Sequence, residues 1–255
     1  MKKKSCFMPE MTKSEIEILI ANNPTVILPL GATESYGNHL PTGTEAFIAE
    51  GFARRVGENA KVLVAPVLNF SWVDWLTDSG TIKFTQQTII DIIEQISLSL
   101  VKQGIKKVLF LNAHFGHVSA SHVVARGLHK NYGIRCASVE VYGMGPSFSE
   151  GILESNSGAW GHGSEGPTSL VLALRPELVD MDQARPDFPV SKNEKFKCIS
   201  SNTIEFEGYR INYYQHFDEI TKTGITGDPT SATKEKGEKL IEKMTNYLTK
   251  VVLAL

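Results

Sequence analysis

Residues 28–45 hold the side chains that metal-dependent chemistry needs. Two carboxylates, Glu34 and Glu45, flank His39 in a segment rich in glycine and proline, directly after the apolar run Val26-Ile27-Leu28. A buried strand followed by a polar loop is a common position for an active site in α/β proteins. Carboxylate oxygens beside an imidazole suit a divalent ion such as Zn, Mn or Fe. The alternative is a solvated loop whose glutamates contact only water.

A second segment with the same chemistry begins at Asn112. It follows the apolar run 108–111, which is suited to a central parallel strand covered on both faces. His114 therefore stands at the carboxyl end of a predicted strand, where backbone pairing stops and a ligand role is favoured over a place in the core. His117 is a second ligand, a proton carrier or a surface residue at the start of the next helix.

The third segment is the loop 160–165. His162 stands between two glycines, which let the backbone approach a ligand closely, and Glu165 adds a third carboxylate. The alternative for this loop is a flexible excursion on the surface.

Strands and helices alternate along the whole chain. We expect strands at 25–30, 61–67, 107–112 and 134–141, and helices at 12–22, 46–56, 85–103, 118–132, from 168 to 174, and 231–253. Between 174 and 224 we expect irregular polar segments. The alternation predicts a three-layer α/β/α sandwich with a mainly parallel sheet. Loops that follow parallel strands gather at one edge, which would bring the three segments together.

The composition is that of an ordinary globular protein. The chain has 255 residues, of which 42% are hydrophobic and 21% charged, with a formal net charge of -2. We expect one domain over 1–255, with no nucleic-acid or membrane partner. No apolar region follows Lys2-Lys3-Lys4, so no signal peptide is predicted. The three cysteines form no CxxC pair, and a reducing cytoplasm is the expected setting.

These segments resemble the creatininase family of metal-dependent amidohydrolases, which also includes formamide-cleaving deformylases. Residues 31–45 resemble the family pattern G-x-x-E-Q-H-G-x-H-L-P-x-x-T-D, and 112–117 resemble N-G-H-G-G-N. Residues 162–169 resemble H-A-G-E-x-x-T-S, and 224–229 match G-x-x-G-D-P. The resemblance covers nearly the whole chain, in the family's order.

The resemblance implies a centre of two metal ions bridged by the carboxylate at position 45. Its ligands would be Glu34, Glu45, His114 and Glu165, the last because Gly116 stands where some members have a carboxylate. The metal would polarise an amide carbonyl that a metal-activated water attacks. His162 would pass a proton to the leaving nitrogen. The family also implies a homo-oligomer, often a hexamer.

Several residues depart from the family pattern. Tyr36 replaces a metal-binding histidine, and a neutral phenol with a pKa of about 10 is a poor ligand. Glu45 is one methylene longer than the bridging aspartate. Trp75 and His117 replace a histidine and an asparagine of many members. Either His39 or His117 compensates, or the site holds a single ion, so we expect one or two divalent ions per subunit.

We therefore predict a hydrolase that cleaves a C–N bond in a small cyclic amide or formamide. Alternatives are a hydrolase that opens a keto-inositol-type ring and an inactive binding or structural homologue. Loss of the histidine at 36 favours the inactive homologue, and the retained carboxylates argue against it because they would be costly to bury without a cation. The expected site comprises the catalytic residues His162, Tyr36 and His117, the substrate-binding residues Trp75, Trp160, His39 and Phe115, and the metal ligands given above.

Overall fold

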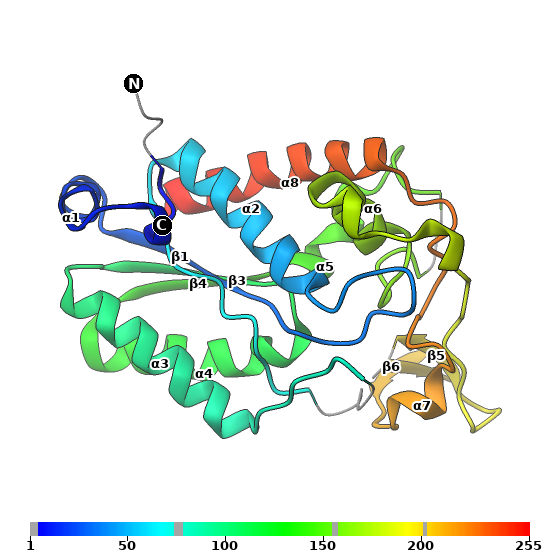
Figure 1. The fold of residues 1–255 in the computed structure, drawn as a ribbon. Coiled ribbons are helices and arrows are strands. Elements are labelled where there is room, and N and C mark those ends of the chain that lie inside the picture. The colour runs from blue at the N-terminus through cyan, green and yellow to red at the C-terminus, as the bar shows by residue number, and fades with distance from the viewer. Residues whose placement is uncertain (1–4, 74–78, 155–157, 201–202) are drawn as a thin grey trace.

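A computed structural model describes residues 5–73, 79–154, 158–200 and 203–255. Its central sheet has four parallel strands in the order β2-β1-β3-β4. The strands are β1 (Thr25–Leu30), β2 (Leu63–Val64), β3 (Lys107–Asn112) and β4 (Arg135–Glu140). Helices lie on both faces of this sheet (Figure 1). The predicted three-layer fold with a mainly parallel sheet is confirmed.

The central strands bury alternate side chains on opposite faces. Ile27 of β1 and Leu109 of β3 pack toward α2 (Thr44–Ala60), α6 (Glu165–Leu174) and α8 (Lys234–Ala254). Val26 and Phe110, from the same two strands, pack toward α3 (Gln86–Lys102) and α4 (Phe115–Tyr132). Figure 1 shows α2, α6 and α8 on one side of the sheet and α3 and α4 on the other. Two separate cores therefore hold the strands in place, as expected for strands buried on both faces.

Most predicted elements are present with shifted ends. Helix α1 (Lys13–Asn22) has Thr12 as its N-cap, and the side chains of Thr12 and Glu15 form the expected capping box. Helices α2, α4 and α6 each begin two or three residues before the predicted position. These shifts place Glu45 in the first turn of α2 and make His114 the N-cap of α4.

The expectation of irregular segments before residue 224 is wrong. Strands β5 (Lys197–Ser200), β6 (Thr203–Phe206) and β7 (Tyr209–Asn212) form a small antiparallel sheet, followed by α7 (Phe217–Ile220). The turn between β6 and β7 is Glu207-Gly208, and both residues have positive φ, at 50° and 84°. Two such residues between strands form the tight hairpin turn that sequence reasoning missed here.

The remaining elements are short. They are α5 (Val141–Met144) and the 3-10 turns η1 (Met8–Glu10), η2 (Gly145–Phe148), η3 (Pro176–Leu178) and η4 (Met181–Gln183). Among the described helices, none combines the length and the apolar character that crossing a bilayer requires.

Pairing of β1 with β3 sets the position of the candidate site. Leu30, the last residue of β1, pairs with Asn112, the last residue of β3. The loop that carries Glu34 and the residue His114 therefore start at neighbouring points on the carboxyl edge of the sheet. This edge is where parallel α/β folds place their ligands.

Candidate metal centre

Three buried side chains converge at this edge. One ligand atom from each of Glu34, Glu45 and His114 lies within 4.8 Å of the other two. His114 Nδ1 is 2.7 Å from Glu45 Oε2 and 3.4 Å from Glu34 Oε2. Gly31 makes this convergence possible, because a Cβ there would lie 2.6 Å from the backbone of Ala46 at the start of α2. The structure thus brings together three of the four residues expected to bind metal.

The contact of the other ring nitrogen of His114, Nε2, determines which nitrogen is available to bind a metal. Nε2 lies 3.2 Å from the Trp72 carbonyl oxygen, which can only accept a hydrogen bond. Nε2 therefore carries a proton, and the lone pair of the neutral ring is on Nδ1, which faces Glu34 and Glu45. A carbonyl that orients a histidine through its second nitrogen is typical of metal-binding histidines.

The two carboxylates of this group favour a positive charge between them. Burial lowers the pKa of His114, but the two carboxylates outweigh it and hold this pKa well above its usual value. Burial raises the pKa of Glu45, whereas His114 outweighs burial and lowers that of Glu34. Positive charge at Nδ1, either a proton or a metal ion, is what stabilises two buried carboxylates here.

The group fits a divalent ion. Oε2 of Glu45 is buried and lies 2.7 Å from His114 Nδ1, with no other hydrogen-bond partner among the described residues. Two carboxylates and one imidazole match the donor preferences of zinc, manganese and iron. Three protein ligands with one open position are typical of a catalytic site rather than a structural one.

Tyr36 contacts the group directly. Its hydroxyl donates a hydrogen bond to Glu45 Oε1 at 3.0 Å and lies 3.3 Å from the Tyr142 hydroxyl. Burial raises the pKa of both phenols well above the usual value, so both remain protonated. Sequence reasoning missed Tyr142, although it follows β4 and so stands at the same edge of the sheet as the other site residues.

His162 lies against Tyr36. The two ring centroids are 3.7 Å apart, and His162 Nε2 donates to the Ser35 carbonyl oxygen at 2.9 Å. The His162 backbone N–H donates to Thr226 Oγ1 at 2.7 Å, which attaches this loop to the segment 224–229. His162 thus lies against the ring of Tyr36, whose hydroxyl contacts Glu45.

Other expected site residues lie outside this group. Both carboxylate oxygens of Glu165 accept from the Glu154 backbone N–H, and Lys236 Nζ lies 2.8 Å from one of them. Trp160 donates through Nε1 to Ser149 Oγ, with its ring 6.4 Å from that of Tyr142. Phe115 is 56% exposed. Trp75 lies outside the described residues.

His117 and His39 are buried and hold loops in place. His117 Nε2 lies 3.1 Å from the Phe70 carbonyl oxygen, and burial, with a smaller effect of His114, lowers its pKa to about 3. His39 Nε2 lies 3.0 Å from Thr168 Oγ1, and burial lowers its pKa to about 4. Neither belongs to the group formed by Glu34, Glu45 and His114.

The lowered pKa of His39 predicts a loss of stability in acid. The folded chain binds this proton less readily than the unfolded chain, so the contribution is complete above pH 6.5 and is lost as the pH falls toward 4. The free energy of unfolding should fall by up to ~3 kcal/mol for this group over that interval. His39→Gln should show a smaller fall in urea unfolding between pH 7 and 4, whereas the exposed-site control His122→Gln should match the wild type. An equal fall in all three proteins would contradict the assignment.

A parallel sheet between two helix layers, with carboxylates and an imidazole at its carboxyl edge, is an arrangement that suits a metal-dependent α/β enzyme. Within this class the chain belongs to the creatininase family, because the family model described as creatinine amidohydrolase matches residues 9–252.

Curated relatives cover almost the same length. Creatinine amidohydrolase of Pseudomonas putida is 26% identical over 94% of this chain and 93% of its own. A mycofactocin precursor peptide peptidase of Mycobacterium tuberculosis (strain CDC 1551 / Oshkosh) is 25% identical over 89% of this chain and 83% of its own. The 3-dehydro-scyllo-inosose hydrolase of Thermotoga maritima is 22% identical over 96% and 82%.

Solved structures show the same fold. A crystal structure of creatinine amidohydrolase matches with a TM-score of 0.81 and 21% identity, over 98% of this chain and 97% of the other. Solved creatininase structures include a zinc–zinc form and a manganese form. The family consists of metal-dependent hydrolases, and Glu34, Glu45 and His114 form a possible metal site in the described part of this chain.

Proposed function

We propose that this protein hydrolyses a C–N bond in a small cyclic amide or formamide, using a divalent ion held by Glu34, Glu45 and His114. The supporting observation is Nδ1 of His114, which faces two buried carboxylates while Nε2 donates to the Trp72 carbonyl. Similarity to creatinine amidohydrolase supports an amide substrate.

The ion, when bound, supplies Lewis acidity and lowers the pKa of a water molecule. The chain's own residues then arrange the remaining groups. Tyr36 holds Glu45 through Oε1, which leaves Oε2 directed at the centre. His162, fixed by the Ser35 carbonyl, has Nδ1 available to carry a proton to a leaving nitrogen. Trp160 and Tyr142 provide aromatic surface beside these groups.

A keto-inositol-type ring is the second candidate substrate. Similarity to the 3-dehydro-scyllo-inosose hydrolase supports it, as do Tyr36 and Glu45, which differ from the family pattern within the site itself. The Tyr36 hydroxyl donates to Glu45, so its oxygen, like that of Tyr142, can accept a hydrogen bond from a hydroxyl-rich ring.

We also expect a single domain, a cytoplasmic setting and a homo-oligomer. Sedimentation would test the oligomeric state, and cell fractionation would test the setting.

Removal of metal should abolish turnover. We would screen the wild type with creatinine, other cyclic amides, formamides and a keto-inositol, in the presence of Zn, Mn or Fe(II). Activity on the accepted substrate should disappear after chelation and return when the ion is added back. Glu34→Ala should remain folded and lose turnover, which separates an enzyme from a scaffold. Turnover that survives both chelation and Glu34→Ala would overturn the proposal.

A further inference from the structure

We infer that this centre holds a single divalent ion per chain, with the Tyr36 and Tyr142 hydroxyls occupying the side of Glu45 where a second ion would bind. The inference rests on the proposed metal-dependent function and specifies its stoichiometry. Four observations on the described residues support it.

The first contact concerns Glu45. A carboxylate bridges two ions only when both of its oxygens face a metal. Here Oε2 faces His114 Nδ1, while Oε1 accepts the Tyr36 hydroxyl at 3.0 Å. Tyr142 stands behind that hydroxyl at 3.3 Å. Glu45 therefore presents one oxygen to an ion, and the Tyr36 hydroxyl fills the other side.

The second contact concerns Gly116. A Cβ at this position would lie 2.3 Å from the Trp72 carbonyl oxygen and 2.7 Å from His114 Nε2, closer than atoms can approach. The same carbonyl holds Nε2 of His114. The Trp72 carbonyl that orients His114 thus leaves no room for a metal-binding side chain at position 116.

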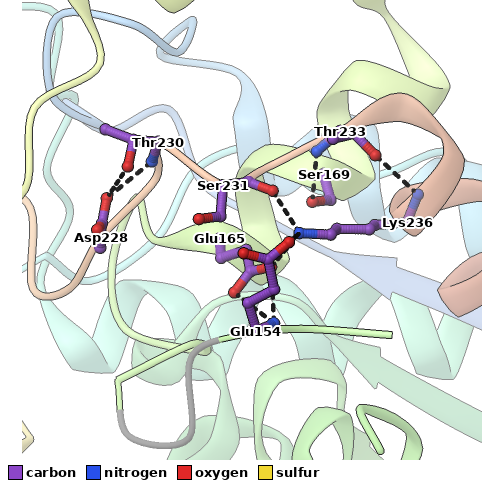
Figure 2. A network of polar contacts seen from close by, with 8 residues as sticks. All are labelled: Glu154, Glu165, Ser169, Asp228, Thr230, Ser231, Thr233 and Lys236. Carbon is purple, nitrogen blue, oxygen red and sulfur yellow. Dashed lines mark hydrogen bonds and ion pairs between the residues drawn. The ribbon is translucent and has the colours of Figure 1, made fainter. Parts of the chain in front are cut away.

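The third contact concerns Glu165. Figure 2 shows its carboxylate beside Lys236, at the junction of Glu154, Ser231 and the start of α8. It accepts the Glu154 backbone N–H, and Lys236 Nζ lies 2.8 Å from Oε1 and 2.6 Å from the Ser231 carbonyl oxygen. Glu165 is completely buried, so moving it to a metal would break its ion pair with Lys236 and leave the Glu154 backbone N–H without its acceptor.

The fourth observation concerns the histidines that might have supplied another ligand. His39 Nε2 lies against Thr168, His117 Nε2 against the Phe70 carbonyl, and His162 Nε2 against the Ser35 carbonyl. Among the described residues, only Glu34, Glu45 and His114 form a group of ligand geometry. Three protein ligands around one ion leave a position open for substrate or water.

The test is the number of ions bound. Protein purified without chelators, then saturated with Mn(II) and desalted, should contain about one ion per chain by elemental analysis. Its electron paramagnetic resonance spectrum should be that of an isolated Mn(II), without the exchange coupling of a close pair. About two coupled ions per chain would overturn this inference and leave the proposed function intact. No uptake of any offered ion would overturn both.

Two variants test the assignment of the phenol. Tyr36→Phe removes the hydroxyl and should still bind about one ion, because the phenol is not a ligand. Glu45→Gln, the matched loss of a ligand charge, should bind that ion far more weakly in the same titration. A folded Tyr36→Phe protein that no longer binds the ion would make Tyr36 a ligand and contradict the arrangement inferred here.

Discussion

Glu45→Gln should lower kcat/KM by about 10³-fold or more on any substrate that the wild type accepts. Glu45 contacts both His114 Nδ1 and the Tyr36 hydroxyl, so in the proposed centre its charge would stabilise the ion while its second oxygen holds the phenol. Glutamine keeps the length and volume of the side chain but places a neutral amide beside Nδ1. A metal ion supplies several kcal/mol of transition-state stabilisation, and about 4 kcal/mol corresponds to ~10³-fold in rate.

Glu50→Gln is the matched control for this change. Glu50 lies on the same helix, α2, and pairs with Arg54 at a half-exposed position away from the group. This control should keep both its metal content and its kcat/KM. Steady-state kinetics with elemental analysis on the three proteins measures the effect. Equal activity in Glu45→Gln and the wild type would remove Glu45 from the centre.

Lys236→Met should lower the free energy of unfolding by about 3–5 kcal/mol. Lys236 Nζ contacts Glu165 and the Glu154 carboxylate, each at 2.8 Å, and it is 15% exposed in its side chain (Figure 2). Its removal leaves Glu165 as a completely buried carboxylate without its cation, which is among the costliest single changes in a protein. Urea unfolding at neutral pH measures the loss.

Lys234→Met separates this effect from a general loss of charge on α8. Lys234 pairs with Glu238 at 3.8 Å on the exposed surface, so its replacement should cost no more than ~0.5 kcal/mol. Adding Glu165→Gln to Lys236→Met should recover most of the lost stability, because the buried charge is then gone. Equal losses in the two lysine variants would show that the buried ion pair contributes no more to the free energy of unfolding than the exposed pair does.

Much of the fold could be predicted because its signals are local. The apolar runs at 25–30 and 107–112 identify the two central strands, and Thr12 with Glu15 identifies the start of α1. Helix ends were less accurate, because α4 begins at Phe115 inside a segment that is rich in glycine and histidine. The hairpin at Glu207-Gly208 was missed because Glu is an unusual residue at positive φ.

Part of the site also follows from the sequence. Glu34 and His114 follow the two central strands, and parallel pairing brings such residues together. The position of Glu165 could not be predicted, because its partner Lys236 lies far along the chain and spacing alone does not reveal which carboxylate has its own cation. The contact between Tyr36 and Glu45 depends on how the loop folds back over α2, which only the structure describes.

The register of β1 against β3 has a thermodynamic consequence. The ligand loops start from Leu30 and Asn112, which are paired in the sheet but distant in the chain. An ion held by both loops would bind only when the two central strands are paired. It would therefore link the carboxyl ends of β1 and β3. Each tenfold rise in free metal above the dissociation constant then adds about 1.4 kcal/mol to folding. Metal supply would therefore change the free energy of folding of this chain as well as whether it can react.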